Sequence, residues 1–156
     1  MEEIFKIVLT SAFTIIGAVL IFSITKILEL VYIKPFFDFK DKLSKTNTNL
    51  NFYRNILTNS VNREEINDGL VKEIMKAQET VRADWASLKS VHAVTPKLFK
   101  NRNKVFSSEE MKKIGENLLY LSNAPIIRSS QMQRPDDSME RYEMINEIEE
   151  IFKKYL

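Results

Sequence analysis

The sequence predicts an all-α fold in which one N-terminal transmembrane helix continues into a cytosolic helical bundle of about four helices. Two patterns predict this architecture. A long run without charged residues lies near the N-terminus, and apolar residues recur at spacings of three and four through most of the remaining chain. No stretch of useful length alternates apolar and polar residues, as a strand with one buried face would.

The composition excludes several kinds of catalytic and metal site. The 156 residues include 3 Gly, 0 Cys and 1 His. Disulfides, cysteine nucleophiles, cysteine-based metal centres and multi-histidine sites are therefore ruled out, and three isolated glycines do not form a phosphate-binding loop. Asp84, beside the single tryptophan, is most simply a hydrogen-bonding residue at a helix–helix seam. We expect no enzymatic activity, no cofactor and no metal.

The first element is a membrane-spanning helix. Ile7–Thr25 comprises 19 residues without a charge, and a helix of this length extends about 28 Å, close to the roughly 30 Å hydrocarbon core of a bilayer. A cleaved signal peptide would start with basic residues, whereas this segment follows the acidic leader MEEIFK. The other alternative is a buried helix of a soluble protein. We expect an uncleaved anchor over residues 1–34, closed by Pro35.

The lysines on either side of the uncharged run predict its orientation. Only Lys6 precedes the run, whereas several lysines follow within about 20 residues: Lys26, Lys34, Lys40, Lys42 and Lys45. The positive-inside rule then places the N-terminus outside and the chain from about residue 34 onward in the cytoplasm. This predicts a single-pass protein of the inner (plasma) membrane.

Small residues share one face of the predicted span. Thr10, Thr14 and Ala18 follow each other at a spacing of four, with Gly17 beside them. Such faces allow transmembrane helices to approach closely, so these four residues are the candidate span-packing or pore residues.

A heptad stripe predicts the next helix. Phe36, Phe39, Leu43, Thr46, Leu50, Tyr53 and Leu57 recur at spacings of 3, 4, 3, 4, 3 and 4. Heptads describe the seam of an intramolecular bundle as well as a coiled coil between subunits. Because the stripe directly follows the small-residue face, it favours a homo-oligomer, with an oligomer stalk formed by Phe36, Phe39, Leu43, Leu50 and Tyr53.

The remaining helices follow from caps and breaks. A second cytosolic helix is expected from about Asn62, with Glu64 and Glu65 in its first turn, to Thr95-Pro96. Ser107 to Glu110 has capping-box spacing and opens a third helix, which ends at residues 122–125 and completes a cytosolic domain over residues 35–125. Residues 126–156 then form a loop and a final helix that packs on the bundle or on a neighbouring subunit. Its expected inward residues are Tyr142, Ile145, Ile148, Phe152 and Tyr155.

A basic segment carries the candidate ligand site. No acidic residue lies between Asp84 and Glu109, and the cations there alternate with aromatic rings. The candidates are Lys89, His92, Lys97, Phe99, Lys100, Arg102 and Lys104, which together suit a phosphate-bearing ligand such as a nucleotide or oligonucleotide. Two alternatives stay open, namely pairing with the acidic final helix and contact with anionic lipid headgroups. A lone histidine such as His92 is more often a capping or surface residue than a ligand.

The order of these features resembles a group of small bacterial single-span membrane proteins with a cytosolic helical domain. The resemblance covers about residues 7–125, including Lys34-Pro35, Asn51–Asn55 and Leu121–Asn123. In layout the chain is similar to membrane effectors of anti-phage defence, which act as oligomeric pores or membrane disruptors, some of them under nucleotide or oligonucleotide control. The resemblance implies no catalytic residue.

Two functions are therefore expected from the sequence. The first is a homo-oligomeric membrane effector, an ion channel or membrane-disrupting protein in antiviral defence, controlled through its cytosolic domain. The alternative is a non-channel anchor or scaffold whose cytosolic helices recruit a partner protein encoded nearby.

Overall fold

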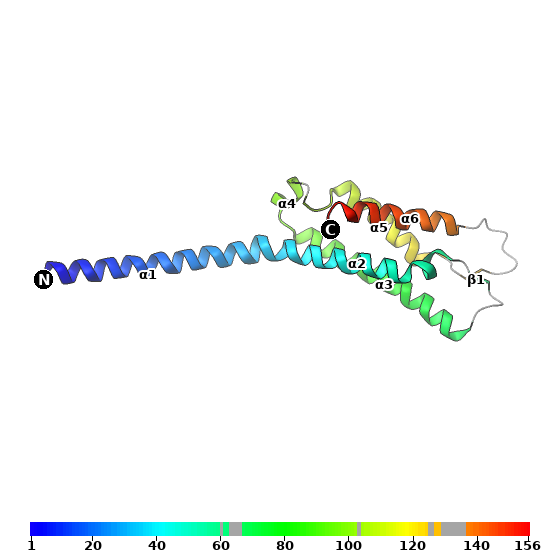
Figure 1. Ribbon diagram of the computed structural model, residues 1–156, viewed down its shortest axis with the longest axis horizontal. Coiled ribbons are helices and arrows are strands. Elements are labelled where there is room, and N and C mark those ends of the chain that lie inside the picture. The colour runs from blue at the N-terminus through cyan, green and yellow to red at the C-terminus, as the bar shows by residue number, and fades with distance from the viewer. Residues whose placement is uncertain (60, 63–66, 103, 125–126, 129–136) are drawn as a thin grey trace.

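The predicted all-α architecture is confirmed. The computed structural model describes residues 1–59, 61–62, 67–102, 104–124, 127–128 and 137–156 (Figure 1). A long N-terminal rod consists of α1 (Glu2–Leu28), the π-helical turn η1 (Glu29–Ile33) and α2 (Lys34–Thr58). Beside α2 lie α3 (Asp68–Val94), α4 (Lys97–Asn101), α5 (Ser108–Asn123) and α6 (Ser138–Lys153). The four long helices α2, α3, α5 and α6 make up the bundle.

The rod does not end at Pro35, where the sequence predicts a break. Helical backbone runs without interruption over the 57 residues from Glu2 to Thr58. Proline lacks an N–H donor, and its ring crowds the carbonyl four residues earlier. The turn directly before Pro35 is the wider π-helical η1, in which the Lys34 N–H donates to the Glu29 carbonyl. We attribute the continuity to this turn, which gives the ring room.

No described part of the chain covers the surface of α1. The structure describes α1 throughout and buries none of its residues. Its hydroxyl groups bond to the backbone one turn earlier: Thr10 Oγ1 donates to the Lys6 carbonyl at 2.8 Å, and Thr14 Oγ1 donates to the Thr10 carbonyl at 2.9 Å. This self-pairing satisfies polar side chains in hydrocarbon. Among the described residues, the rod is the one helix long and apolar enough to cross a membrane.

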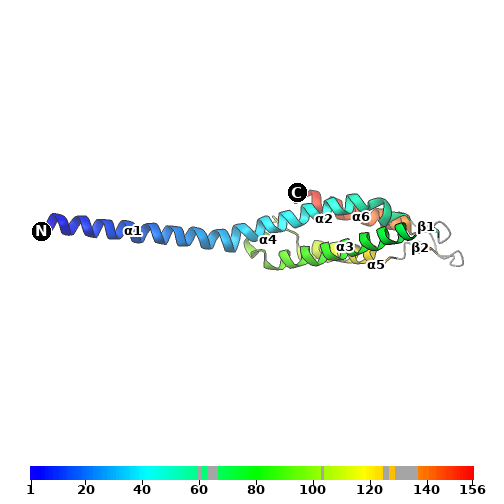
Figure 2. The ribbon, with the colours of Figure 1, turned by 90° about the horizontal axis from the view of Figure 1, so that it is seen from below.

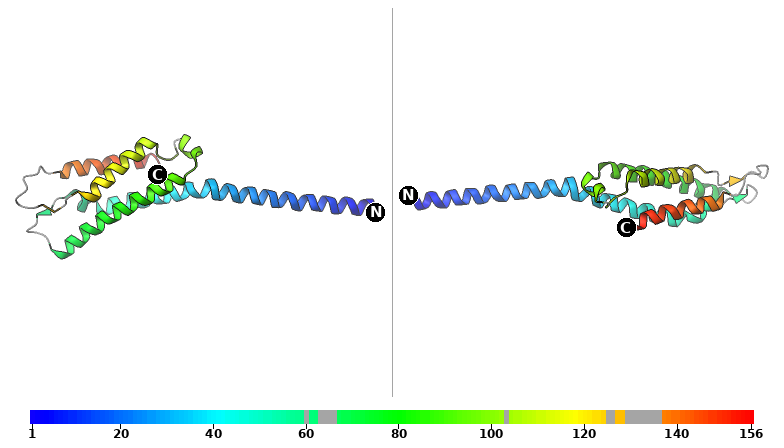
Figure 3. Two further views of the ribbon diagram at one scale, coloured as in Figure 1. Left: turned by 180° about the vertical axis from the view of Figure 1, so that it is seen from behind. Right: turned by 90° about the horizontal axis from the view of Figure 1, so that it is seen from above.

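The helices of the bundle alternate in direction. α2 runs away from the span, α3 returns, α5 runs away again and α6 returns (Figures 1, 2 and 3). The end of the bundle next to α1 is called the proximal end below, and it holds α4 and the C-terminus (Figure 1). At the distal end, the two-residue strands β1 (Val61–Asn62) and β2 (Ile127–Arg128) pair in parallel, a contact that the sequence pattern does not predict.

The heptad stripe of α2 faces the core of its own bundle. Phe39, Leu43 and Leu57 have 0% exposed surface, and Leu50 and Tyr53 have 1% and 8%. They pack in one cluster with side chains from the other three long helices, among them Ile74, Leu88, Ile114, Leu118, Ile145 and Phe152. The prediction that these residues form a stalk between subunits is therefore wrong, because α3 and α6 of the same chain already cover the stripe. Phe36 is half-buried and contacts α4 instead.

Local signals in the sequence predict the start of α5 correctly but place the start of α3 too early. Asn62 lies in β1, and α3 begins only at Asp68, where Asn67 accepts a hydrogen bond from the Leu70 N–H at 2.8 Å. The expected first-turn residues Glu64 and Glu65 lie outside the described residues. The capping box of α5 is confirmed, because the Glu110 N–H donates to Ser107 Oγ and the Ser107 N–H donates to the Glu110 carboxylate.

The inward face of α6 differs from its prediction at one position. Ile145, Ile148, Phe152 and Tyr155 are buried as expected, but Tyr142 is 43% exposed and Arg141 is 0% exposed. The Arg141 guanidinium donates to Asp137 Oδ2 at 3.2 Å and to the Thr58 carbonyl at 3.4 Å. Because α2 ends at Thr58, Arg141 supplies a cation to the negative end of the α2 dipole.

Replacing Leu50 should destabilise the bundle. Leu50→Ala removes buried methyl groups and leaves a cavity, so we expect the free energy of unfolding to fall by about 2–5 kcal/mol. The matched control is Phe52→Ala on the same helix, because Phe52 is 76% exposed and should change stability by less than about 0.5 kcal/mol. Urea unfolding of the full chain in detergent micelles, followed by far-UV circular dichroism, measures both. Equal losses would contradict the core assignment.

Candidate functional site

The seven candidate ligand residues separate into two groups. Lys89 and His92 lie on α3 and line a groove between α3 and α5. The other five belong to α4 and the residues after it at the proximal end: Lys97, Phe99, Lys100, Arg102 and Lys104. We call residues 97–104 the basic segment. Within it, Lys97–Asn101 form the short helix α4.

Aromatic stacking holds the basic segment against the start of α2. The rings of Phe99 and Phe36 stack with centroids 4.6 Å apart and an interplanar angle of 18°. The Lys104 N–H donates to the Phe99 carbonyl at 3.0 Å, and Val105 and Phe106 then enter the core with 1% exposed surface each. Phe106 is buried and therefore not free to stack on a base, and Phe36 covers one face of the half-buried Phe99 ring.

The cations of the basic segment are not neutralised within the chain. Lys97, Lys100, Arg102 and Lys104 form no ion pair with any residue that the structure describes. Burial and, secondarily, the nearby Lys104 ammonium lower the pKa of Lys40 on α2. The proximal end therefore carries an excess of positive charge.

Two acidic side chains of α6 form ion pairs with other helices of the bundle. Glu149 pairs with Arg54 of α2 at 3.0 Å, and Glu147 pairs with Lys113 of α5 at 3.2 Å. Among the described residues of one chain, the basic segment thus forms no ion pair with the final helix, and the alternative that predicts such pairing is wrong. Pairing between subunits stays a prediction.

His92 is a structural tether. Its Nε2 lies 2.9 Å from the Phe106 carbonyl, and its half-buried ring lies near the rings of Phe39 and Phe106. Burial lowers the pKa of His92, the Phe106 carbonyl opposes this shift, and the Lys100 ammonium adds to it. A neutral imidazole that donates its Nε2 proton to the carbonyl fits this environment, and it ties the end of the basic segment to α3.

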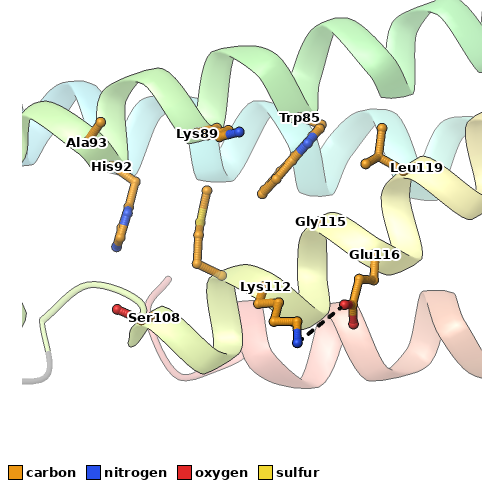
Figure 4. A pocket seen from close by; sticks show the side chains of 10 residues that line it. Trp85, Lys89, His92, Ala93, Ser108, Lys112, Gly115, Glu116 and Leu119 are labelled. Atoms are coloured by element: carbon orange, nitrogen blue, oxygen red, sulfur yellow. Dashed lines mark ion pairs between the residues drawn. The ribbon is translucent and has the colours of Figure 1, made fainter.

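The groove between α3 and α5 has an apolar floor and a volume of about 470 Å³ (Figure 4). Its lining consists of Trp85, Lys89, His92, Ala93, Ser108, Met111, Lys112, Gly115, Glu116 and Leu119. Trp85 lies directly on Gly115, where an added Cβ would be 2.4 Å from the indole Cζ2. The absent side chain at Gly115 therefore lets the indole form the floor.

Charged groups border this floor. The Lys89 ammonium lies 6.0 Å from the centroid of the Trp85 ring, and Lys112 pairs with Glu116 at 3.8 Å (Figure 4). Sequence reasoning missed the groove. Gly115 is the signal that points to it, since a glycine inside a helix costs about 1 kcal/mol and so indicates a close contact.

Asp84 has the structural role that the sequence predicts. It is 7% exposed and accepts a hydrogen bond at 2.7 Å from the Asn49 amide across the seam between α2 and α3. Burial raises the pKa of Asp84, and the Asn49 hydrogen bond opposes the shift. No three His, Asp or Glu side chains of the described residues are grouped closely enough to hold a metal ion.

The span-packing candidates lie on the rod, away from both the groove and the basic segment. Thr10, Thr14 and Ala18 are exposed, and a Cβ added at Gly17 would meet nothing within 4 Å. No other described part of the chain covers their face.

No family model, curated protein or solved structure matches this chain. The resemblance to anti-phage membrane effectors therefore stays a prediction.

His92 should make the stability of the bundle depend on pH. The folded state lowers the pKa of His92 below its unfolded value of about 6.5, so the unfolded chain binds a proton first as the pH falls. The free energy of unfolding should decrease from pH 7.5 to pH 5.5, and urea titrations in detergent at three pH values measure it. Because the chain has one histidine, His92→Gln should flatten this slope while keeping a donor for Phe106. The same slope in both proteins would contradict the assignment.

Proposed function

We propose that the protein is a non-enzymatic single-span membrane anchor, and that its cytosolic bundle is a docking module for a helix of a partner protein. The observation that carries this proposal is the open apolar groove between α3 and α5. The proposed location is the inner (plasma) membrane, with the N-terminus outside and the bundle in the cytoplasm, on the evidence of the lysines that follow the span.

The rod supports the anchoring part of the proposal. Because α1, η1 and α2 form one helix, the bundle has no flexible linker to the span. A protein bound to the bundle would be held next to the bilayer in a defined orientation.

The groove supports the docking part. Leu119 is 44% exposed and Trp85 is half-buried, although α5 already contributes Ile114 and Leu118 to the core. Leu119 thus presents an apolar side chain at the groove surface, beside Trp85 and Met111, which also pack against the core. An amphipathic helix buries apolar residues at spacings of three and four in such a groove, and acidic residues beside them would lie near Lys89.

A crosslinking experiment in the native host tests this function. A photoreactive phenylalanine analogue in place of Leu119 should give one discrete adduct with a partner, and Ala93→Glu should abolish it by placing a negative charge in the groove. The matched control places the analogue at Tyr142, which has a similar exposed fraction of 43% on α6. Identical adducts from both positions, or an adduct that Ala93→Glu leaves unchanged, would remove the docking function. Circular dichroism establishes that each variant is folded.

A second candidate is the homo-oligomeric membrane effector, a pore or membrane-disrupting protein. The observation that favours it is the uncovered small-residue face of Thr10, Thr14, Gly17 and Ala18. A single span does not enclose a water path, so conduction would require several copies around an axis. A nucleotide or oligonucleotide that controls the pore from the bundle would have to act on the span through the continuous rod.

A larger side chain on the small-residue face of the span tests the pore candidate. Gly17→Ile should weaken association in detergent by about tenfold and reduce depolarisation of cells that express the protein, because the helices no longer approach closely. Val19→Ile, on the opposite face of the helix, is the matched control. Analytical ultracentrifugation and a membrane-potential dye provide the two measurements. A monomeric native chain without effect on the membrane potential would leave the anchor as the function.

A further inference from the structure

We propose that the basic segment is a second membrane contact, an interfacial anchor that binds the headgroups of anionic lipids beside the span. This inference rests on the proposed membrane insertion of the rod, but it is independent of the groove and of any partner protein.

The position of the segment is the first support. Exposed apolar side chains continue along the rod as far as Ile33, which is 48% exposed, so the boundary of the apolar surface lies near Lys34. Phe36 follows two residues later, about 3 Å further along the helix axis. Since Phe99 stacks on Phe36, α4 lies at the level of the headgroup layer, which is roughly 5 Å or more thick on each side of the hydrocarbon core.

The composition of this end of the bundle is the second support. Leu98 is 48% exposed, Phe37 is 64% exposed and Val94 is 66% exposed. Leu98 is next to Lys97 in the sequence and Val94 lies three residues before it, while Phe37 contacts Phe36, the ring on which Phe99 stacks. Exposed apolar groups together with lysine and arginine are typical of interfacial segments, in which the alkyl parts enter the acyl boundary and the charges stay among the phosphates.

The engagement of the aromatic rings favours a lipid surface over a nucleic acid. A single-stranded nucleic acid stacks its bases on free ring faces, but Phe106 lies in the core and Phe36 covers one face of the Phe99 ring. A nucleic acid would also leave the exposed aliphatic side chains of Leu98 and Val94 without a partner. An anionic bilayer contacts both the charges and the apolar groups.

A single-cysteine label measures the contact in the full chain. Because the protein has 0 Cys, Leu98→Cys accepts one environment-sensitive fluorophore. In nanodiscs with phosphatidylglycerol we expect blue-shifted emission and quenching by spin-labelled lipids, and both should be weaker in pure phosphatidylcholine. The matched control is a label at Met75, which is 64% exposed in the distal half of α3 and should remain in water in both nanodiscs.

Charge removal distinguishes electrostatic binding from simple proximity. Lys97→Gln combined with Lys104→Gln should weaken docking of the segment by about 25-fold, at about fivefold for each charge near an anionic surface. Lys72→Gln combined with Lys76→Gln removes two exposed lysines from the distal half of α3 and should have no effect. Raising the salt concentration should reproduce the effect of the proximal pair.

Three results would overturn the proposal. The first is the same aqueous emission from the Leu98 and Met75 positions in anionic nanodiscs, and the second is unchanged docking after the proximal lysines are removed. The third is a response to single-stranded oligothymidylate in phosphatidylcholine nanodiscs without a response to phosphatidylglycerol, which would indicate a nucleic-acid site. A label at Ile15 reports insertion separately, because its quenching in every nanodisc is required for the anchor itself. Circular dichroism establishes that the labelled variants are folded.

Discussion

The continuous helical backbone from α1 into α2 is the constraint on which the rest of the structure depends. α2 is both the extension of the span and the helix whose buried stripe organises the core. A flexible linker at Pro35 would separate these two roles. The π-helical turn η1 precedes the proline and carries the helix past it, so the bundle is assembled directly on the end of the span.

This arrangement decides which surfaces are left for other molecules. Because α2 buries Leu43 and Leu50 against its own bundle, this stripe is not available for association with another chain. Three surfaces of the described residues lie at different places along the protein: the small-residue face of α1, the basic segment at the proximal end and the groove between α3 and α5. Each has a different chemistry, so lipid, another span and a partner helix would not compete for the same residues.

Local signals in the sequence predict the long apolar helix, the capping box at Ser107 and the ends of α3 and α5, because these depend on residues within one or two turns, but they do not predict the start of α3 or the continuity through Pro35. The partner of the heptad stripe is not predictable in this way, since the same spacing suits an intramolecular seam and a stalk. α4 is too short, at 5 residues, to show helical periodicity. The groove and the inward position of Arg141 depend on contacts between distant segments, and only Gly115 gives a local sign of either.

The length of the rod has a mechanical consequence. The 25 residues of α2 extend about 37 Å beyond the π-helical turn. Spanning helices tilt by about 20° on average, and the angle changes with bilayer thickness. Without a hinge, a tilt of that size displaces the distal end of α2 sideways by about 13 Å. With α1 inserted as proposed, a change in lipid composition that alters bilayer thickness would therefore change the orientation of the whole bundle relative to the membrane.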